Sequence, residues 1–205
     1  MEIAGLIAGL GNPGPQYDLT RHNFGFMVLD ALLQGRAGFP VASAPVSSRS
    51  NTYRLWKMTP WHGAAPWLLV KPMTYMNLSG EAVGHACRYY KLDPAGVLVV
   101  HDELDLPLGR LKIKFGGGAA GHKGIRSITQ HLGGPDFTRL RLGIGKPEFG
   151  DTASYVLRRF SPEESSLAGE VVEQALRGIE TFIRSGLEQA MQEINGFNAG
   201  PGESG

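Results

Sequence analysis

The sequence predicts an α/β fold, a three-layer α/β/α sandwich built around a mixed β-sheet. Short apolar runs alternate along the chain with segments of helical periodicity, as in folds whose strands are connected through helices. Residues 53–58 and 67–70 are apolar runs separated by a proline-rich turn, and the hairpin that they predict makes the sheet mixed. A chain of 205 residues is long enough for one domain with its own core.

The first strand is predicted over the apolar run 3–10, which is too continuous for a strand with one exposed face. A turn rich in glycine and proline follows, and Thr20 is a suitable N-cap for the helix predicted over 24–33. The carboxyl ends of parallel strands are where α/β proteins gather their active-site groups. Because His22 stands between this strand and this helix, we expect the rest of the chain to present groups to His22.

The remaining elements continue the alternation. Ser161 is followed by a proline and then by Glu164, which indicates a capping box at the start of a long acidic helix. The polar, glycine-rich residues 195–205 are predicted to form a disordered C-terminal tail, which leaves 1–194 as the domain. The other predicted elements are strands over 97–100, 111–115 and 139–144 and helices over 78–91, 123–132 and 187–194.

The composition is that of an ordinary globular protein, with 42% hydrophobic and 19% charged residues. Cys87 is the only cysteine, so an internal disulfide is excluded and an intracellular location is expected. No apolar run approaches the roughly 20 residues of a membrane span, and the amino terminus lacks the basic flank of a secretory signal. These features predict a cytoplasmic protein without a membrane partner.

The charges are distributed unevenly, although the formal net charge is only +1. Residues 109–146 carry eight basic side chains and one acidic side chain, whereas residues 161–193 carry seven acidic and two basic side chains. The basic segment fits a local phosphate-binding surface, and it fits equally a solvated surface of uneven charge. The sequence leaves both interpretations open.

The turn after the first strand matches a dinucleotide-binding fingerprint in its glycine spacing, Gly9-x-Gly-x-x-Gly. That fingerprint requires a continuous helix around its third glycine and a second strand that ends in an acidic residue. Pro15 follows the third glycine directly, and residues 35–40 lack a strand pattern, so a nicotinamide cofactor is not expected. The glycines make either a plain tight turn or an active-site turn, and Asn12 and Asn23 near the histidine favour the second.

The residue types narrow the chemistry to hydrolysis with a histidine as general base. Ser79 does not stand in a nucleophile elbow, Cys87 lies inside a predicted helix, and a His-Glu-x-x-His motif is absent. His22, Asp102 and His122 have the side chains of a metal site, but the set is more typical of orienting groups, so no metal is expected.

A histidine can deprotonate water because its ordinary pKa lies near neutrality. Asp102 is a carboxylate at the end of a predicted buried strand, where it can fix the tautomer of His22 and stabilise its charged form. The amides of Asn12 and Asn77 can bind a carbonyl without adding charge, although Asn77 also suits the N-cap of the following helix. These groups support ester or amide hydrolysis.

Five stretches, in order along the chain, give the sequence a resemblance to a known family. They are Gly-Leu-Gly-Asn12-Pro-Gly with Tyr17 and Thr-Arg-His22-Asn, Lys-Pro-Met-Thr-Tyr75-Met-Asn77-Leu-Ser-Gly, His-Asp102-Glu-Leu-Asp-Leu-Pro-x-Gly, Lys-Phe-Gly-Gly-Gly-x-x-Gly-His122-x-Gly, and Arg-Leu-Arg141-x-Gly-Ile-Gly. From Ile3 to about Ile194, the chain resembles the bacterial peptidyl-tRNA hydrolases. The resemblance implies a single α/β domain with a twisted mixed sheet.

The resemblance also implies cleavage of the ester that joins a peptide to the 3′ ribose of tRNA, without a cofactor, by a monomeric cytoplasmic enzyme that recycles tRNA. It implies His22 as the general base, Asp102 as the group that keeps His22 basic, and Asn12 as a residue that helps to separate peptidyl-tRNA from free aminoacyl-tRNA. The residues implied in binding tRNA or peptide are Tyr17, Tyr75, Asn77, His122, Lys123, Lys114 and Arg141, of which the last two fall in the basic segment.

The sequence departs from the family pattern beside His122. The family usually has asparagine where Lys123 stands, and His-Gly where Ala119 and Ala120 stand. Lys123 either points to solvent at a helix start or contacts the substrate, and the sequence leaves both open. The alternative to an enzyme is an RNA-binding relative that has lost catalysis, and the presence of the predicted catalytic residues disfavours it.

Overall fold

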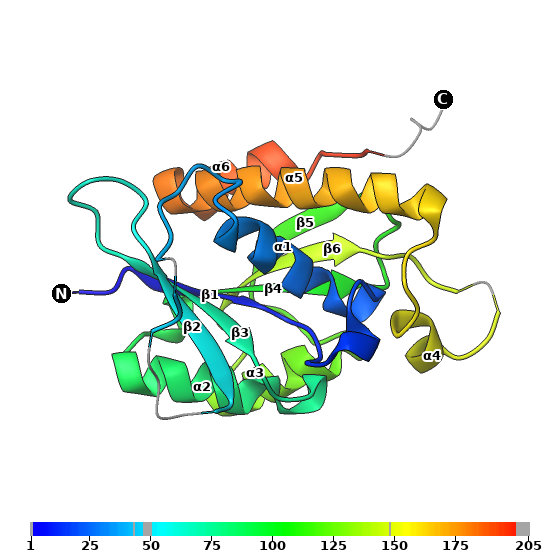
Figure 1. Ribbon diagram of the computed structural model, residues 1–205, viewed down its shortest axis with the longest axis horizontal. Helices are drawn as coiled ribbons and strands as arrows, with labels where there is room; N and C mark the ends of the chain where they lie inside the picture. Colours follow the sequence, from blue (N-terminus) through cyan, green and yellow to red (C-terminus); the bar gives the residue numbers. More distant parts are fainter. Residues whose placement is uncertain (1, 43, 47–50, 148, 200–205) are drawn as a thin grey trace.

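The computed structural model describes residues 2–42, 44–46, 51–147 and 149–199. A six-stranded sheet runs through the middle of the molecule in the order β2-β3-β1-β4-β6-β5 (Figure 1). Its strands are β1 (Gly5–Gly9), β2 (Tyr53–Met58), β3 (Trp67–Pro72), β4 (Val97–Glu103), β5 (Leu111–Phe115) and β6 (Thr138–Gly143). None of the helices among the described residues is both long and apolar enough to cross a membrane.

The sheet is mixed, as predicted, because its two outer strands run against the rest. The pairs β1–β3, β1–β4 and β4–β6 are parallel, whereas β2–β3 and β5–β6 are antiparallel. The four central strands therefore end at one common edge of the sheet. This is the edge at which α/β proteins place their ligands.

Helices cover both faces of the sheet, which confirms the predicted three layers (Figure 1). On one face lie α1 (Phe24–Leu33), α5 (Pro162–Ser185) and α6 (Leu187–Ile194), and on the other lie α2 (Ser79–Tyr90) and α3 (Lys123–Leu132). Strand β1 is buried along its whole length, with Ile7 in the core under α1 and α5 and with Leu6 and Ala8 in the core above α2 and α3. This double burial explains why its sequence is an unbroken apolar run.

Two glycines let helix α1 lie directly on the strands. A Cβ at Gly25 would collide with backbone atoms of Leu10 and Val100, and a Cβ at Gly9 would collide with the backbone of Gly25. Only glycine permits so close an approach of backbones. The approach brings the turn before α1, which carries His22, against the carboxyl ends of β1 and β4.

The structure differs from the predicted elements in three places. A short helix, α4 (Thr152–Val156), was not predicted and lies beyond the carboxyl ends of the strands. Strand β4 continues to Glu103, so Asp102 lies within the strand and pairs with Leu142 rather than following it. Helix α2 begins at Ser79 after a 3-10 turn that contains Asn77, and no side chain caps its start.

Both edges of the sheet are covered by irregular segments. Along β5, the amide of Asn195 bonds both the N–H and the C=O of Ile113, and Ala199 N–H bonds the oxygen of Gly109. Residues 195–199 of the predicted tail therefore contact the sheet, while 200–205 lie outside the described residues. Along β2, the N–H groups of Ala42 and Val46 bond to the strand.

Candidate active site

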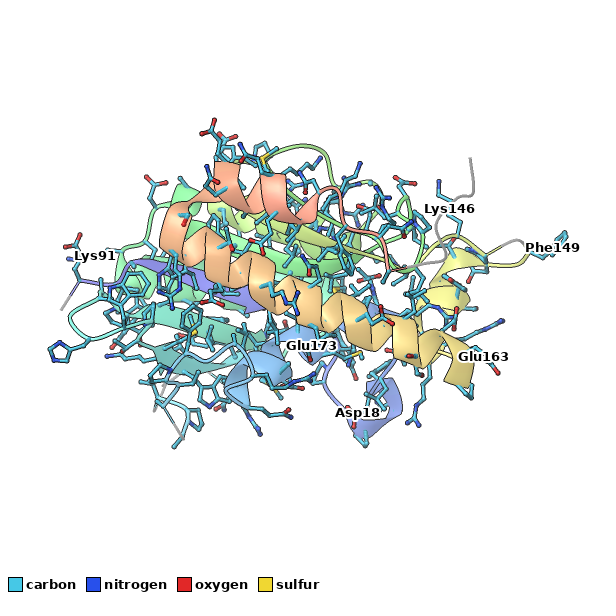
Figure 2. The ribbon with its side chains drawn as sticks, turned by 90° about the horizontal axis from the view of Figure 1, so that it is seen from above. Asp18, Lys91, Lys146, Phe149, Glu163 and Glu173 are labelled. Atoms are coloured by element: carbon cyan, nitrogen blue, oxygen red, sulfur yellow. The ribbon has the colours of Figure 1, made fainter. Side chains whose placement is uncertain are left out.

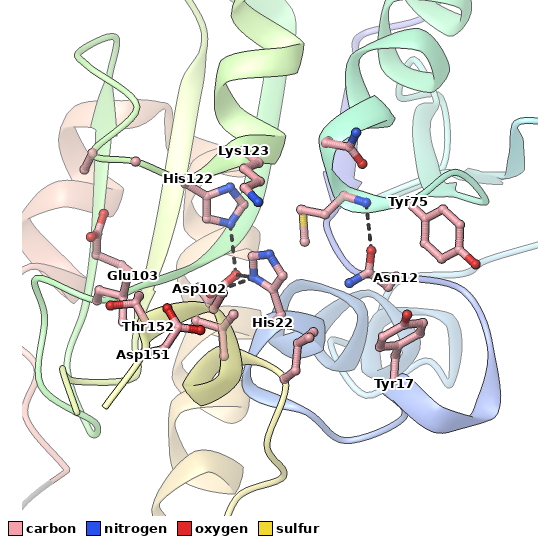
Figure 3. A pocket seen from close by; sticks show the side chains of 18 residues that line it. Asn12, Tyr17, His22, Tyr75, Asp102, Glu103, His122, Lys123, Asp151 and Thr152 are labelled. Atoms are coloured by element: carbon pink, nitrogen blue, oxygen red, sulfur yellow. Dashed lines mark hydrogen bonds and ion pairs between the residues drawn. The ribbon is translucent and has the colours of Figure 1, made fainter. Parts of the chain in front are cut away.

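A cavity of about 510 Å³ opens at the carboxyl edge of the sheet, and most of the predicted site residues line it (Figure 3). Its walls come from the turn after β1, the loop after β3, the end of β4, the start of α3 and helix α4. The predicted residues that line it are Asn12, Tyr17, His22, Tyr75, Asn77, Asp102, His122 and Lys123, whereas Lys114 and Arg141 line a neighbouring cavity.

His22 and Asp102 form a hydrogen-bonded pair at the bottom of this cavity. The Nδ1 atom of His22 lies 2.9 Å from Oδ1 and 3.0 Å from Oδ2 of Asp102. The side chain of His22 is 13% exposed and that of Asp102 only 2%, so the pair is open to the cavity on the histidine side. An imidazole that donates its Nδ1 proton to a carboxylate has an unprotonated Nε2. In this arrangement His22 presents a basic nitrogen on the side away from Asp102.

A second histidine shares the same carboxylate. The Nε2 atom of His122 lies 2.9 Å from Oδ1 of Asp102, and its Nδ1 accepts the backbone N–H of Ile125 at 3.2 Å. A nitrogen that accepts a hydrogen bond carries no proton, so His122 donates from Nε2 to Asp102. Both ring nitrogens of His122 are thus occupied within the protein. This arrangement fits a residue that positions Asp102 better than one that binds substrate directly.

The two histidines keep Asp102 ionised. Burial by itself raises the pKa of the Asp102 carboxyl, because a buried charge is poorly solvated. The electrostatic influence of His22 and His122 and their hydrogen bonds outweigh burial and hold this pKa well below its usual range. Asp102 therefore accepts hydrogen bonds from both rings and donates none.

A third histidine lies behind this pair. The Nδ1 atom of His101 donates to the backbone oxygen of Asp102 at 2.7 Å, and its ring centre is 4.9 Å from that of His122. Burial, and then the electrostatic influence of the neighbouring His122 ring, lowers the pKa of His101 well below its usual value. His101 is therefore a neutral, buried neighbour of the His22–Asp102 pair, and its Nε2 has no partner among the described residues.

The orientation of the Asn12 amide is fixed by its surroundings. Its Oδ1 accepts the backbone N–H of Met76 at 2.7 Å, so its Nδ2 group is the part left for a ligand. Asn23 holds the backbone of Asn12 from both sides, because its Oδ1 accepts Asn12 N–H at 2.8 Å and its Nδ2 donates to Asn12 O at 3.0 Å. Asn12 thus presents two N–H donors to the cavity.

Tyr17 and Tyr75 form the end of the cavity near Asn12 (Figure 3), and Asn77 also lines the cavity. The rings of Tyr17 and Tyr75 meet edge to face, with their centres 6.3 Å apart, and Tyr75 is 56% exposed. Asn77 is exposed and does not cap helix α2, so the purely structural role that the sequence left open for it is not realised. Its amide is free to contact a ligand.

Helix α4 forms a wall that sequence reasoning missed. Thr152, Ala153, Val156 and Leu157 line the cavity, together with Asp151, whose side chain caps the helix by accepting Ser154 N–H. The only sequence signal was this cap, an aspartate after a glycine. Lys123 is an exposed residue at the first position of α3 and also lines the cavity (Figure 3).

Arg21 ties α4 to the turn that carries His22. Its guanidinium donates to the backbone oxygen of Arg159 at 2.8 Å and to both carboxylate oxygens of Glu164 at 2.7 and 2.6 Å. The guanidinium carbon also lies 4.4 Å from the ring centre of Tyr155, at the end of α4. The side chain of Arg21 is buried, and these contacts fix the α4 wall relative to His22.

Lys114 and Arg141 lie on a basic face formed by β5 and β6. Lys114 pairs with Arg139 and Lys112 with Arg141, which places all four cations on one face of the two strands. Lys114, Arg139 and Arg141 line a cavity of about 320 Å³ that shares Glu103 with the first cavity. Glu103 bonds Arg141 at 2.9 Å, and burial together with the neighbouring arginines lowers the pKa of Lys114.

Two other chemical possibilities find little support. Donor atoms of His22, Asp102 and His122 lie within 4.8 Å of one another, a spacing that a metal ion could bridge. The hydrogen bonds described above already account for this cluster, and a metal would have to displace both protons. Burial raises the pKa of the Cys87 thiol to about 11, so Cys87 is not a nucleophile at neutral pH.

The chain is similar to one family over nearly its whole length. A family model described as "Peptidyl-tRNA hydrolase" matches residues 6–201. A peptidyl-tRNA hydrolase of Nitratidesulfovibrio vulgaris is 54% identical over 199 residues, which cover 96% of this chain and 99% of the relative. One of Oleidesulfovibrio alaskensis is 50% identical over 196 residues, covering 95% of this chain and 98% of the relative.

Solved structures agree with the sequence comparison. A crystal structure of peptidyl-tRNA hydrolase from Acinetobacter baumannii has a TM-score of 0.84 and 34% identity, covering 97% of this chain and 98% of that one. A crystal structure of a peptidyl-tRNA hydrolase complex with N-propanol has a TM-score of 0.85 and 33% identity, covering 98% of this chain and all of that one. The chain therefore matches peptidyl-tRNA hydrolases in both sequence and fold over nearly its whole length.

Proposed function

The chain belongs to the peptidyl-tRNA hydrolase family, and we propose that it cleaves the ester of peptidyl-tRNA with a water molecule that His22 activates. Membership of the family makes it a hydrolase that acts on the ester bond of peptidyl-tRNA. The observation that carries the mechanism is the buried carboxylate of Asp102, which lies 2.9 Å from Nδ1 of His22 and 2.9 Å from Nε2 of His122.

The reaction proceeds by proton transfer through Nε2 of His22. This nitrogen takes a proton from water as the water oxygen bonds to the ester carbonyl carbon, and Asp102 stabilises the imidazolium that forms. The tetrahedral intermediate then collapses, and the bond between the carbonyl carbon and the 3′ oxygen of the ribose breaks. The imidazolium returns its proton to that oxygen. The products are a peptide with a free carboxyl group and a tRNA with a free 3′ hydroxyl.

Asn12 distinguishes blocked from free aminoacyl groups. Because its Oδ1 is bound to Met76 N–H, it offers only N–H donors to the substrate. A peptidyl substrate has an amide carbonyl beside the esterified residue that can accept such a bond. A free aminoacyl-tRNA has an ammonium group there, which can only donate, so the N–H groups of Asn12 repel it.

The other site residues hold the two halves of the substrate. Tyr17, Tyr75 and Asn77 bind the 3′ end of the tRNA and the adjoining peptide, and Lys123 contacts the same region from the start of α3. His122 acts through Asp102, as a positioning residue. The absence of protein partners for Asn77, among the described residues, supports its assignment to the substrate.

The basic face of β5 and β6 receives tRNA phosphates. Lys114, Arg139 and Arg141 gather beside the active-site cavity, and Arg139 is buried with two of its guanidinium nitrogens unpartnered among the described residues. Unpartnered buried donors of this kind favour a bound anion. We further propose one domain over 1–194, a monomeric state and a cytoplasmic location, where recycling of tRNA during translation takes place.

The test is a single-turnover assay with N-acetyl-phenylalanyl-tRNA and phenylalanyl-tRNA. The wild-type protein is expected to cleave the first much faster than the second. His22→Ala is expected to lower kcat by about 10²- to 10⁴-fold while binding of deacylated tRNA persists, because only the base is lost.

His62→Ala is the matched control, because His62 is an exposed histidine in the loop between β2 and β3. This variant should turn over like the wild type. Turnover of His22→Ala within a few-fold of the wild-type rate would remove His22 from the role of general base.

A further inference from the structure

Two further cavities adjoin the active-site cavity and share lining residues with it. The basic cavity of about 320 Å³ shares Glu103 with the active-site cavity, and a third cavity of about 230 Å³ shares Asn12 with it. Glu103 and Asn12 lie on opposite sides of the His22–Asp102 pair (Figure 3). The reacting ester at His22 therefore has the basic cavity on one side and the third cavity on the other.

The third cavity combines apolar walls with charged groups at its rim. Its apolar walls are formed by Phe26 and Leu33 of α1, Trp56 of β2 and Met73 after β3. We call it the peptide cleft, and define it by Asn12, Asp18, Phe26, Arg54, Trp56 and Met73. Apolar walls with a few polar groups are the usual composition of a ligand-binding cleft.

The charges of the cleft are of two kinds. Lys71 is neutralised, because its Nζ lies 2.7 and 2.8 Å from the carboxylate oxygens of Asp30 and 4.5 Å from the ring centre of Phe26. Arg54 and Asp18 are exposed, and their side chains have no ionic partner among the described residues. Within the part of the chain that the structure describes, the cleft therefore offers the unpaired cation of Arg54 and the unpaired carboxylate of Asp18 beside an apolar wall.

We propose that the peptide cleft is a subsite for the nascent peptide and receives the side chain of the residue next to the esterified one. This inference rests on the proposed function, which places tRNA phosphates at the basic cavity and the ester at His22. The acyl part must then extend past Asn12, whose N–H donors face the first amide carbonyl of the peptide. The cleft begins at Asn12, on the side away from the tRNA.

The chemistry of the cleft suits a substrate whose sequence varies. Apolar side chains can pack on Phe26 and Trp56, acidic ones can approach Arg54, and basic ones can approach Asp18. Opposite charges at the rim leave a small preference between acidic and basic side chains. A hydrolase that meets peptides of every sequence needs such a subsite.

The test uses N-acetyl-dipeptidyl-tRNAs with either glutamate or lysine beside the esterified residue. The measured quantity is the ratio of kcat/KM for the glutamate substrate to that for the lysine substrate. Arg54→Glu should lower this ratio, and Asp18→Lys should raise it, each by about two- to tenfold at low salt, because exposed charge pairs contribute modestly and are screened. A change of preference in opposite directions cannot come from loss of folding.

Lys57→Glu is the matched control, because Lys57 is an exposed lysine on the same strand as Arg54 but points to the opposite face. It should leave the ratio unchanged. If neither Arg54→Glu nor Asp18→Lys moves the ratio while N-acetyl-phenylalanyl-tRNA is still cleaved, the peptide cleft is not a peptide subsite. Equal effects on both substrates would instead assign the cleft to tRNA. If the wild-type protein cleaves none of these substrates, the proposed function itself is wrong.

Discussion

At the scale of single residues, hydrogen bonds from the backbone decide which hydrogen bonds the side chains of the site can make. Met76 N–H turns the Asn12 amide so that it can only donate, and Ile125 N–H fixes the tautomer of His122. These two contacts determine which atoms face the substrate and which face the protein. Neither backbone group takes part in the chemistry.

Acidification is expected to destabilise the fold through His101. Burial and the electrostatic influence of the neighbouring His122 ring hold the pKa of His101 well below its usual value, whereas in the unfolded chain this pKa is about 6.5. The unfolded chain therefore binds a proton that the folded protein does not, so stability is complete above about pH 6.5 and falls as the pH drops below it. The loss approaches about 1.4 kcal/mol per pH unit.

Urea unfolding at pH 7.5, 6.0 and 5.0 measures this dependence, and His101→Asn should flatten it. Asp102 does not interfere, because its lowered pKa makes it lose stabilising charge only below about pH 4. An undiminished slope in His101→Asn would assign the acid sensitivity to another group.

Lys123 is expected to act on binding rather than on the chemical step. It is exposed at the mouth of the cavity, and lysine can donate hydrogen bonds but not accept them. Lys123→Ala should raise KM by a factor that shrinks as salt increases, and Lys123→Asn should restore near-normal turnover at high salt. A fall in kcat like that of His22→Ala, with unchanged KM, would place Lys123 in the chemical step.

His22, Asp102 and Asn12 could be predicted as site residues from the sequence, because it shows both their chemical types and their positions after apolar runs. The occupied ring nitrogens of His122 were not visible, because they depend on Ile125 N–H and Asp102 meeting one ring in space. The assigned roles of these residues remain proposals.

At the scale of elements, the active-site wall made by α4 depends on a single buried cation. Arg21 is buried and donates to Arg159 O and to Glu164, while its face packs on Tyr155. Its removal takes away the ionic partner of Glu164 and the side-chain donor to the oxygen of Arg159. The turn that carries His22 and the wall opposite then lose their common support.

Arg21→Gln is accordingly expected to lower the free energy of unfolding by about 2 kcal/mol, in the range found for hydrogen bonds to charged groups, because Arg21 is buried but its partner Glu164 is partly exposed. It should also raise KM, because α4 lines the cavity. Urea unfolding and steady-state kinetics measure the two effects. Arg177→Gln, an exposed arginine on α5, is the control. Unfolding of Arg21→Gln at the wild-type urea concentration would contradict this account.

The elements that sequence patterns missed are those whose apolar residues show no regular spacing. Helix α4 has five residues, too few to show an amphipathic stripe, and it is held by Arg21 and by Tyr155 OH on Ile144 O at 2.6 Å. The predicted strand ended before the polar residues at the end of β4, because a buried strand was expected to be apolar. In the structure, β4 continues through these residues, and Asp102 pairs with Leu142. Long helices and central strands were confirmed because their faces are buried against several layers.

At the scale of the whole molecule, the two faces of the sheet differ in charge. Helix α5 crosses one face and carries Glu163 and Glu173 at its surface (Figure 2). The basic residues of β5 and β6 point to the other face, since Leu111, Ile113, Leu140 and Leu142 pack in the core under α5 and α6. A polyanion is therefore attracted to one face and repelled by the other.

Lys114→Gln tests whether this difference in charge between the two faces directs tRNA binding. It should weaken binding of full-length peptidyl-tRNA and reduce the slope of log K against log salt by roughly one, as expected for one lost phosphate contact. A minimal peptidyl-nucleotide should be cleaved as by the wild-type protein. Lys114 is a cleaner choice than Arg141, whose loss would remove the ionic partner of the buried carboxylate of Glu103. Equal losses on both substrates would show that this face does not bind tRNA.

The segments along β2 and β5 have a consequence for the protein in a crowded cell. An open strand is a template on which a second chain can grow, and it is the usual starting point of fibrils and of accidental pairing. Here, Asn195 occupies the N–H and C=O of Ile113 at one margin, and Ala42 and Val46 occupy carbonyls of β2 at the other. The peptide cleft must stay open to unfolded peptides. The covered edges of the sheet prevent those peptides from pairing with β2 or β5 as an additional strand.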